Sequence, residues 1–334
     1  MNKFELASRN TAEIIGEEDL KKLLNGNGKK KPSVYIGTAP TGRPHVGYMI
    51  WILKLNDLLK AGFKVKVLLA DLHALLDGTP YEVLEERYKY YSEIIPEVIK
   101  AIGGDPKDME FVKGSDFELK GDYMKDLLRM ATNVSVRDST KAASDVVKLG
   151  DNPKLAGLIY PLMQALDEEY LKVDMQLGGN DQRKIFVLAR EQHPKIGYKP
   201  RIEMMTPILR GLVGKKMSAS DPNTKIDFLD EPETVKKKIN KAECLEGDLD
   251  NGVIEFMKYI IMVIKKDNKK KFKIERPDKF GGNVEYNDYG SLEKDFVAKK
   301  LHPMDLKVSL AREINEILGK IDRSKMKKLA EKAY

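Results

Sequence analysis

Short β-rich runs alternate with longer helix-like stretches over the first 220 residues of the sequence. Ser33–Gly37 and Lys64–Ala70 are strand-like, the apolar-periodic segment Val46–Leu59 separates them, and Met109–Val112 is a third strand candidate. Strands separated by helical stretches of about 12 or more residues favour a parallel sheet. The sequence therefore predicts an α/β fold with a doubly wound, Rossmann-like parallel sheet. Such sheets bind ligands where loops leave the carboxyl ends of strands, which makes the loop Thr38–Pro44 a candidate site.

The pattern changes near residue 230. Asp230 and Glu233 have the D-x-x-E spacing of a capping box, which predicts a helix start. Further on, apolar residues at helical spacing predict an amphipathic helix from Pro303 to about Lys320; they are Leu306, Leu310, Ile314, Ile317, Leu318 and Ile321. No strand alternation of comparable strength occurs here. We therefore expect an α/β domain over residues 1–229 and a smaller, mostly helical domain over residues 230–334.

The composition argues against several classes of protein. No apolar run approaches the roughly 18–20 residues of a membrane helix. The first twenty residues lack the apolar core of a secretory signal and the acid-poor character of a transit peptide. The single cysteine, Cys244, cannot form an internal disulfide, and no second cysteine exists for a zinc cluster. We therefore expect a cytoplasmic protein that makes no membrane contact.

The net charge of the chain is +7, and most of the excess lies after residue 230. A basic region suits a polyanionic partner such as RNA, because binding releases counterions. A lysine-rich, solvated surface explains the same charge equally well. Charge alone leaves both interpretations open.

Two segments carry groups suited to phosphate chemistry. In Pro40–Tyr48, His45 and Gly47 stand at a predicted helix start, where backbone N–H groups and the helix dipole favour phosphate oxygens. In Gly214–Ser220, two lysines and two serines follow a glycine and offer point charges and hydroxyls to a polyphosphate. Each segment alone is a weak signal, because capping histidines and solvated lysine pairs are common. Their order after a doubly wound pattern strengthens the interpretation.

Both segments resemble signature motifs of class I aminoacyl-tRNA synthetases. His45-Val46-Gly47-Tyr48 is similar to the H-I-G-H motif, and Lys216-Met217-Ser218-Ala219-Ser220 is similar to K-M-S-K-S. Further blocks between about Arg9 and Ile321 resemble the tyrosyl enzymes of the archaeal and eukaryotic cytosolic type: Tyr35–Gly37, Ala70–Ala74, Tyr160–Asp167, Gly178–Lys184, Arg276–Gly282 and His302–Lys307. Nothing resembles the additional C-terminal domain of some eukaryotic members. Tyr48 and Ala219 depart from the class motifs, and Ala219 lacks a side chain that could contact pyrophosphate.

The resemblance implies a tyrosine pocket. It assigns the phenolic hydroxyl to Tyr35 and Asp167, and the ammonium group to Tyr160, Gln164 and Gln182. Asp167 can accept and Tyr35 can donate or accept, which suits a hydroxyl. Tyr160, Gln164 and Asp167 have the spacing of one helical face. The residues expected to form the walls are Gly37, Leu68, His73 and Phe117.

The resemblance also implies ATP as the second substrate. The expected ATP-binding residues are Pro40, His45, Gly47, Lys215, Lys216 and Met217. The expected catalytic residues are His45, Gly47, Lys216, Ser218 and Ser220. Mg²⁺ accompanies ATP in this interpretation, with no prosthetic group and no dedicated protein site for a metal.

The tRNA partner is expected to contact both parts of the chain. An inserted segment over about residues 115–155 is expected to form a homodimer interface after Met124 and to approach the acceptor stem of tRNA(Tyr) through Lys141. Phe280 and Asp305 are expected to read the anticodon from the helical domain. Two alternatives remain: a tryptophanyl-tRNA synthetase, which the Tyr35 and Asp167 pair disfavours, and a non-catalytic RNA-binding protein of the same fold, which the intact motifs disfavour.

Overall fold

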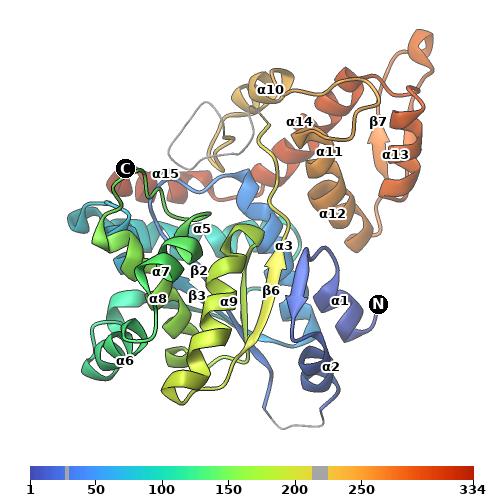
Figure 1. Ribbon diagram of the computed structural model, residues 1–334. Helices are drawn as coiled ribbons and strands as arrows, with labels where there is room; N and C mark the ends of the chain where they lie inside the picture. Colours follow the sequence, from blue (N-terminus) through green and yellow to red (C-terminus); the bar gives the residue numbers. More distant parts are fainter. Residues whose placement is uncertain (27–29, 213–224) are drawn as a thin grey trace.

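A six-stranded sheet forms the centre of the computed structural model, which describes residues 1–26, 30–212 and 225–334. The strand order is β1-β6-β5-β2-β3-β4. The parallel strands are β2 (Ser33–Thr38), β3 (Lys64–Leu69), β4 (Met109–Lys113), β5 (Met175–Gly179) and β6 (Ile202–Thr206). Helices cover both faces of this sheet (Figure 1), so the predicted doubly wound fold is confirmed.

The edge strand β1 (Glu13–Ile15) was not predicted. It pairs antiparallel with β6, which makes the sheet mixed. A strand of three half-buried residues shows too little alternation to be recognised in a sequence. The three strands that were predicted agree with the structure to within one residue at each end.

A short turn and the first crossover helix follow β2. The predicted helix Val46–Leu59 is observed as a short 3₁₀ turn, η1 (Val46–Tyr48), followed by α3 (Met49–Ala61). The helix α3 ends because Gly62 adopts a left-handed conformation with φ of 99°. The other helices of this part are α1 (Lys3–Ser8), α2 (Glu17–Asn25), α4 (Asp71–Leu76), α5 (Leu84–Ala101), α6 (Gly121–Ala131), α7 (Val136–Ala143), α8 (Leu155–Tyr170) and α9 (Arg183–Gln192).

The part after residue 230 is mostly helical, as expected. Its helices are α10 (Pro232–Asn240), α11 (Gly252–Phe256), α12 (Met262–Asp267), α13 (Tyr289–Val297), α14 (Pro303–Leu318) and α15 (Arg323–Ala333). The predicted amphipathic helix is α14, which buries Leu306, Leu310 and Ile314 completely. A two-stranded antiparallel sheet of β7 (Phe272–Ile274) and β8 (Val284–Tyr286) was not predicted.

The predicted capping box at Asp230 is wrong. Helix α10 begins at Pro232, and no side chain caps it. The Asp230 carboxylate instead accepts a hydrogen bond from the Asp227 N–H (2.9 Å) and forms an ion pair with the Lys238 ammonium (2.7 Å). Proline at the first helical position starts the helix without a cap, because its φ is already helical and it has no N–H to satisfy.

The two parts share one continuous apolar core. Buried residues of that core come from both sides of residue 230, including Leu55, Ile99, Val235 and Ile314. Helix α15 also packs against α5 of the first part (Figure 1). The division at residue 230 therefore stays a prediction. Within the described residues, no helix combines the length and apolarity that a membrane crossing needs.

A buried ion-pair network ties the two parts together. The Arg9 guanidinium, which follows α1, donates to Asp57 of α3 through Nε (2.7 Å) and through Nη2. It also donates to both carboxylate oxygens of Asp267 at the end of α12, at 2.8 and 2.7 Å. The Asp57 side chain is only 2% exposed, so its charge depends on this partner.

We expect Arg9→Ala to lower the free energy of unfolding by about 3–5 kcal/mol, because it leaves a buried carboxylate without its cation. Urea unfolding monitored by circular dichroism measures the loss. The matched control is Arg183→Ala, since Arg183 pairs with Glu13 at the surface and side chains there are 47% and 36% exposed. That control should cost less than about 1 kcal/mol. Equal losses in the two variants would contradict the prediction.

Candidate active site

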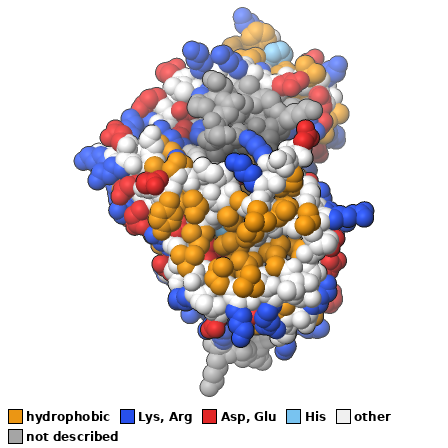
Figure 2. All heavy atoms as spheres, turned by 60° about the vertical axis from the view of Figure 1, so that its left-hand side comes forward, with side chains coloured by type: hydrophobic (Ala, Val, Ile, Leu, Met, Phe, Trp, Pro, Cys, Tyr) orange, Lys and Arg blue, Asp and Glu red, His pale blue; other side chains and the backbone are white. Residues whose placement is uncertain are grey.

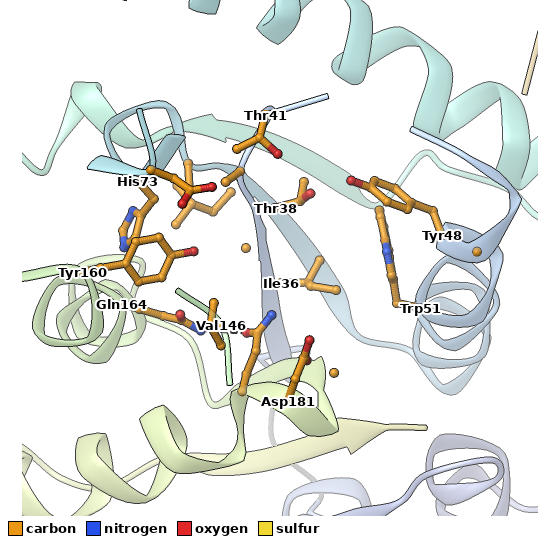
Figure 3. Close-up of a pocket in the computed structure, with 18 of the residues that line it drawn as sticks. Ile36, Thr38, Thr41, Tyr48, Trp51, His73, Val146, Tyr160, Gln164 and Asp181 are labelled. Carbon is orange, nitrogen blue, oxygen red and sulfur yellow. Dashed lines mark hydrogen bonds between the residues drawn. The ribbon is translucent and has the colours of Figure 1, made fainter. Parts of the chain in front are cut away.

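Loops at the carboxyl ends of the parallel strands surround a cavity of about 820 Å³. Figure 3 shows His73, Tyr160 and Gln164 on one side of the cavity and Tyr48 and Trp51 on the opposite side. We refer to these as the His73 end and the Tyr48 end. Ten of the sequence-predicted residues line this one cavity: Tyr35, Gly37, His45, Gly47, Leu68, His73, Tyr160, Gln164, Asp167 and Gln182.

One face of α8 supplies most of the polar groups at the His73 end. Tyr160, Gln164 and Asp167 follow each other at helical spacing and all line the cavity, as the sequence predicts. The Gln164 amide donates to the side-chain oxygen of Gln182 at 2.7 Å. The rings of Tyr160 and His73 meet edge to face, with centroids 4.6 Å apart. These contacts fix the orientation of each side chain before any ligand enters.

Tyr35 and Asp167 present an oxygen pair in the same region. The Tyr35 hydroxyl donates to the backbone carbonyl of Gln164 at 3.3 Å, and its side chain is fully buried. Asp167 accepts a hydrogen bond from the hydroxyl of Tyr123 at 2.8 Å. Burial, together with the negative charge of Asp167, raises the pKa of Tyr35 well above its usual value. Burial likewise raises the pKa of Tyr123 well above its usual value, so both hydroxyls stay protonated and act as donors in these hydrogen bonds.

Sequence reasoning missed Tyr123 and Glu118. Tyr123 lies on α6 at helical spacing from Leu127 and Met130, all buried, so in the sequence it resembles an ordinary core residue. Glu118 is completely buried behind His73 although it follows a predicted wall residue in the sequence. No motif marks either position. Both could be found only after the fold had brought them beside Asp167.

Glu118, His73 and Asp167 form a buried polar group. The His73 ring lies between the two carboxylates, with Nδ1 3.6 Å from Glu118 and Nε2 3.8 Å from Asp167. Burial opposes a charge on the ring, but the two carboxylates outweigh it and raise the pKa of His73. Burial also raises the pKa of Asp167, and Glu118 adds to that effect, while His73 and the Tyr123 hydroxyl oppose it. In the described part of the chain, these three could also hold a metal ion, since their ligand atoms lie within 4.8 Å of one another.

His45 lies beside Tyr48, with ring centroids 4.9 Å apart, and its pKa shifts in the opposite direction to that of His73. Its Nδ1 accepts a hydrogen bond from the Gly47 N–H at 3.2 Å, which caps η1 and leaves the ring proton on Nε2. The side chain is 6% exposed. Burial, assisted by the positive charge of Lys225, lowers the pKa of His45 to about 3. The ring is therefore neutral at physiological pH and offers one N–H donor.

The chain beyond residue 224 returns to this loop. Val46 N–H donates to the carbonyl of Ile226 at 2.9 Å, and the Lys225 ammonium donates to the carbonyl of Arg43 at 3.1 Å. The second motif lies outside the described residues, and so do its predicted site residues Lys215, Lys216, Met217, Ser218 and Ser220. Its neighbour in the sequence, Lys225, lies beside the first motif.

Two predicted site residues do not line the cavity. Phe117 packs behind the wall, where its ring meets that of Tyr123 at 5.7 Å, and it is absent from the lining. Pro40 is buried beside the cavity, and its carbonyl accepts a hydrogen bond from Arg87. In both cases the next residue in the sequence meets the site instead. Glu118 lies against His73, and Thr41 lines the cavity. The expected tRNA-binding residues Lys141, Phe280 and Asp305 also lie outside this cavity.

Comparison with known proteins places this geometry in a family. Residues 27–319 match the family described as tRNA synthetases class I (W and Y), and the chain belongs to it. Its relatives include the cytoplasmic tyrosine–tRNA ligase of Saccharomyces cerevisiae, 46% identical over 99% of this chain and 87% of the relative. The corresponding protein of Danio rerio is 45% identical over 99% of this chain, but this chain spans only 63% of its length.

Solved structures agree with this assignment. The tyrosyl-tRNA synthetase of Archaeoglobus fulgidus, solved in complex with L-tyrosine, has a TM-score of 0.88 and 40% identity, covering 97% of this chain and 98% of that one. A tryptophanyl-tRNA synthetase from Aeropyrum pernix has a TM-score of 0.69 and 20% identity, over 96% of this chain and 85% of that one. The second likeness shows the fold alone.

We expect the stability of the wild type to fall more steeply than that of His45→Asn as the pH drops from about 7 to about 4. Asparagine keeps the cap, because its side-chain oxygen accepts from the same N–H. Below the ordinary value of 6.5, the unfolded chain binds a proton on His45 that the folded protein binds only near pH 3. Stability is therefore lost over that window in the wild type and not in the variant.

Free energies of unfolding in urea at successive pH values measure this difference, and subtraction of the two curves removes the carboxylates common to both proteins. His302→Asn is the matched control. The Nδ1 of His302 accepts from the Met304 N–H at 3.2 Å, but this histidine is exposed. The difference in unfolding free energy between the wild type and His302→Asn should change less with pH than the difference between the wild type and His45→Asn. Parallel curves for the wild type and His45→Asn would show that the ring of His45 is not held neutral.

Proposed function

We propose that this chain attaches L-tyrosine to tRNA(Tyr) at the expense of ATP, through a tyrosyl-adenylate intermediate, with release of pyrophosphate and AMP. The observation that carries the proposal is the arrangement of one cavity. It holds an oxygen pair, Tyr35 and Asp167, near one end, and a neutral histidine at a helix start nearer the other. The relatives and the tyrosine-bound structural neighbour support the same substrate.

Recognition of tyrosine would depend on hydrogen bonds between its phenolic hydroxyl and the side chains of Asp167 and Tyr35. The phenolic hydroxyl would donate to Asp167 and exchange a hydrogen bond with Tyr35, while Tyr160, Gln164 and Gln182 surround the ammonium group. Phenylalanine fits sterically but offers no hydroxyl, so Asp167 and Tyr35 would keep only their contacts within the protein and would lose the hydrogen bonds to the ligand. Tryptophan has an N–H donor but no phenolic oxygen, so the same pair disfavours the tryptophanyl alternative.

The first step needs positioning more than proton transfer. The tyrosine carboxylate is already ionised at neutral pH and attacks the α-phosphorus of ATP; a carboxylate–phosphorus bond forms as the bond to pyrophosphate breaks. The Nε2–H of His45 can donate to a phosphate oxygen, and Gly47 lets the backbone approach it. From the motif, Lys216, Ser218 and Ser220 would stabilise the charge that develops on pyrophosphate, with Lys215 and Met217 beside them.

The second step transfers tyrosine to tRNA. A hydroxyl of the 3′-terminal adenosine attacks the adenylate carbonyl and forms the ester bond. The bond from that carbon to the phosphate oxygen breaks, AMP leaves with the bonding electrons, and the hydroxyl proton is released to water. ATP enters as its Mg²⁺ complex in this proposal, and no prosthetic group takes part. Tyr48, at the position of the second histidine in the class motif, lines the cavity and is given no catalytic role.

The contacts with tRNA are proposed from surface position and charge. Lys141 is exposed on α7. Phe280 is 62% exposed and could stack on an unpaired base. Asp305 already has a structural role: its carboxylate accepts from the backbone N–H of His302 at 3.3 Å and from Arg276 at 3.4 Å. Both bonds end on Oδ2, so its proposed role in reading the anticodon falls to Oδ1.

We also propose a homodimer. Within the inserted segment, Leu119, Met124, Leu128 and Val136 are exposed, and Leu155 is exposed at its end. The side of the molecule that carries α6, α7 and α8 faces forward in Figure 2, where hydrophobic side chains gather. An exposed apolar surface of this kind marks an association site. The relatives named above are described as cytoplasmic, and we propose the same location.

Tyrosine-dependent exchange between ATP and pyrophosphate tests the activity. The wild type should exchange with tyrosine and far less with phenylalanine or tryptophan. Asp167→Ala should reduce the ratio of kcat/KM for tyrosine over phenylalanine by about tenfold to a hundredfold, because it removes a charge-assisted hydrogen bond to the hydroxyl. Exchange with tryptophan alone would favour the tryptophanyl alternative, and no exchange with any amino acid would favour a non-catalytic protein.

Sedimentation velocity tests the homodimer. Leu128→Glu should convert the dimer to a monomer, because it places a charge in an apolar interface. The matched control is Leu245→Glu, since Leu245 is 63% exposed and Leu128 is 66% exposed, but Leu245 lies in the C-terminal part. The control should remain a dimer. A monomeric wild type, or an unchanged mass in both variants, would overturn the proposed interface.

A further inference from the structure

Three consecutive carbonyls of the loop after β2 are held by side chains from elsewhere in the fold. The carbonyls of Pro40 and Thr41 accept from Nη1 of Arg87, at 3.0 and 2.8 Å. The carbonyl of Gly42 accepts from two phenolic hydroxyls, that of Tyr91 at 2.6 Å and that of Tyr334 at 2.7 Å. A backbone carbonyl has two lone pairs, so that of Gly42 is fully used.

Tyr334 reaches this loop from the far end of the described chain. It follows α15, which packs along α5 (Figure 1). The Arg87 guanidinium lies over the Tyr334 ring, 4.6 Å from its centroid, and Nε of Arg87 donates to the carbonyl of Ala333 at 3.3 Å. The ring of Tyr90 meets that of Tyr334 edge to face at 6.1 Å. Arg87 therefore binds the loop and α15 at once.

The loop belongs to the cavity, whereas Tyr334 does not. Thr41 lines the cavity (Figure 3), and Tyr334 is absent from the lining. Tyr91, the other donor to Gly42, has its hydroxyl 3.4 Å from that of Tyr48, whose ring meets the His45 ring edge to face at 4.9 Å. The same hydroxyl contacts thus connect the loop, the Tyr48 end and the neutral histidine.

We propose that Tyr334 is a positioning residue for ATP, which fixes the Pro40–Gly42 loop against α15 so that Thr41 and His45 keep the spacing that the nucleotide requires. This inference rests on the proposed function. Loss of the Tyr334 hydroxyl leaves Tyr91 on the Gly42 carbonyl, so the loop loosens and the fold stays intact. A segment of the C-terminal helical part thereby contributes to the Tyr48 end of a cavity built by the α/β part.

Tyr334→Phe isolates the hydroxyl, because it keeps the ring beneath Arg87. We expect KM for ATP in pyrophosphate exchange to rise about three- to tenfold, with KM for tyrosine and the melting temperature unchanged, since one neutral hydrogen bond is lost. The dissociation constant for ATP, measured by isothermal titration without tyrosine, should rise by the same factor. The matched control is Tyr286→Phe, whose hydroxyl donates to Asp295 at 3.0 Å in the C-terminal part. It should leave both constants unchanged.

The outcomes separate the inference from the proposed function. Unchanged ATP constants in Tyr334→Phe, with a normal wild type, overturn the inference alone. A lower melting temperature with equal changes for ATP and tyrosine makes Tyr334 merely structural and also overturns it. A wild type that exchanges with no amino acid but binds ATP contradicts the proposed function, and the titration still decides the inference. A wild type that neither binds ATP nor exchanges pyrophosphate overturns both.

Discussion

The parallel register of β2 with its two neighbours is the constraint on which the rest of the site depends. Gly37 of β2 lies opposite Leu68 of β3, and Ile36 lies opposite Leu177 of β5, so the three strands deliver their following loops to one edge of the sheet. Close packing at that edge requires glycine. A Cβ at Gly178 would lie 2.6 Å from the Phe186 ring and 2.7 Å from the side-chain oxygen of Gln182. The strand register therefore brings the segments that carry the polar groups of the cavity to one edge, and side-chain contacts then orient the groups.

The pKa values of two histidines in one cavity shift in opposite directions because their neighbours differ. Both rings are buried, and burial alone favours the neutral form of each. Glu118 and Asp167 overcome this effect at His73, whereas Lys225 reinforces it at His45. The cavity thus presents a histidine whose pKa is raised between two acidic side chains near one end and an uncharged N–H donor nearer the other. This difference follows from packing partners that lie 45 or more residues away in the sequence.

The sequence predicted what periodicity and motif spacing can encode. The strands β2, β3 and β4 and the helical face that carries Tyr160, Gln164 and Asp167 were located correctly, and ten predicted residues meet in one cavity. The strands β5 and β6 were not predicted. The sequence could not show which residues of a loop face the cavity, and Phe117 and Pro40 are absent from its lining. Tyr123 has the spacing of a core residue, and the three-residue strands β1, β7 and β8 are too short to alternate visibly. Lys238 draws Asp230 away from the helix start, a competition that local spacing does not reveal.

Helix α6 has two faces with different tasks, and they cannot move independently. Its inner face carries Tyr123, which holds Asp167 at 2.8 Å, and its outer face exposes Leu128 to the surroundings. Hydrogen bonds weaken steeply once the donor and acceptor separate or tilt. A rotation or slide of α6 by a fraction of a helical turn would therefore change the hydrogen bond to Asp167. A contact on the outside of this helix would therefore also change the geometry of the Asp167 carboxylate inside the cavity.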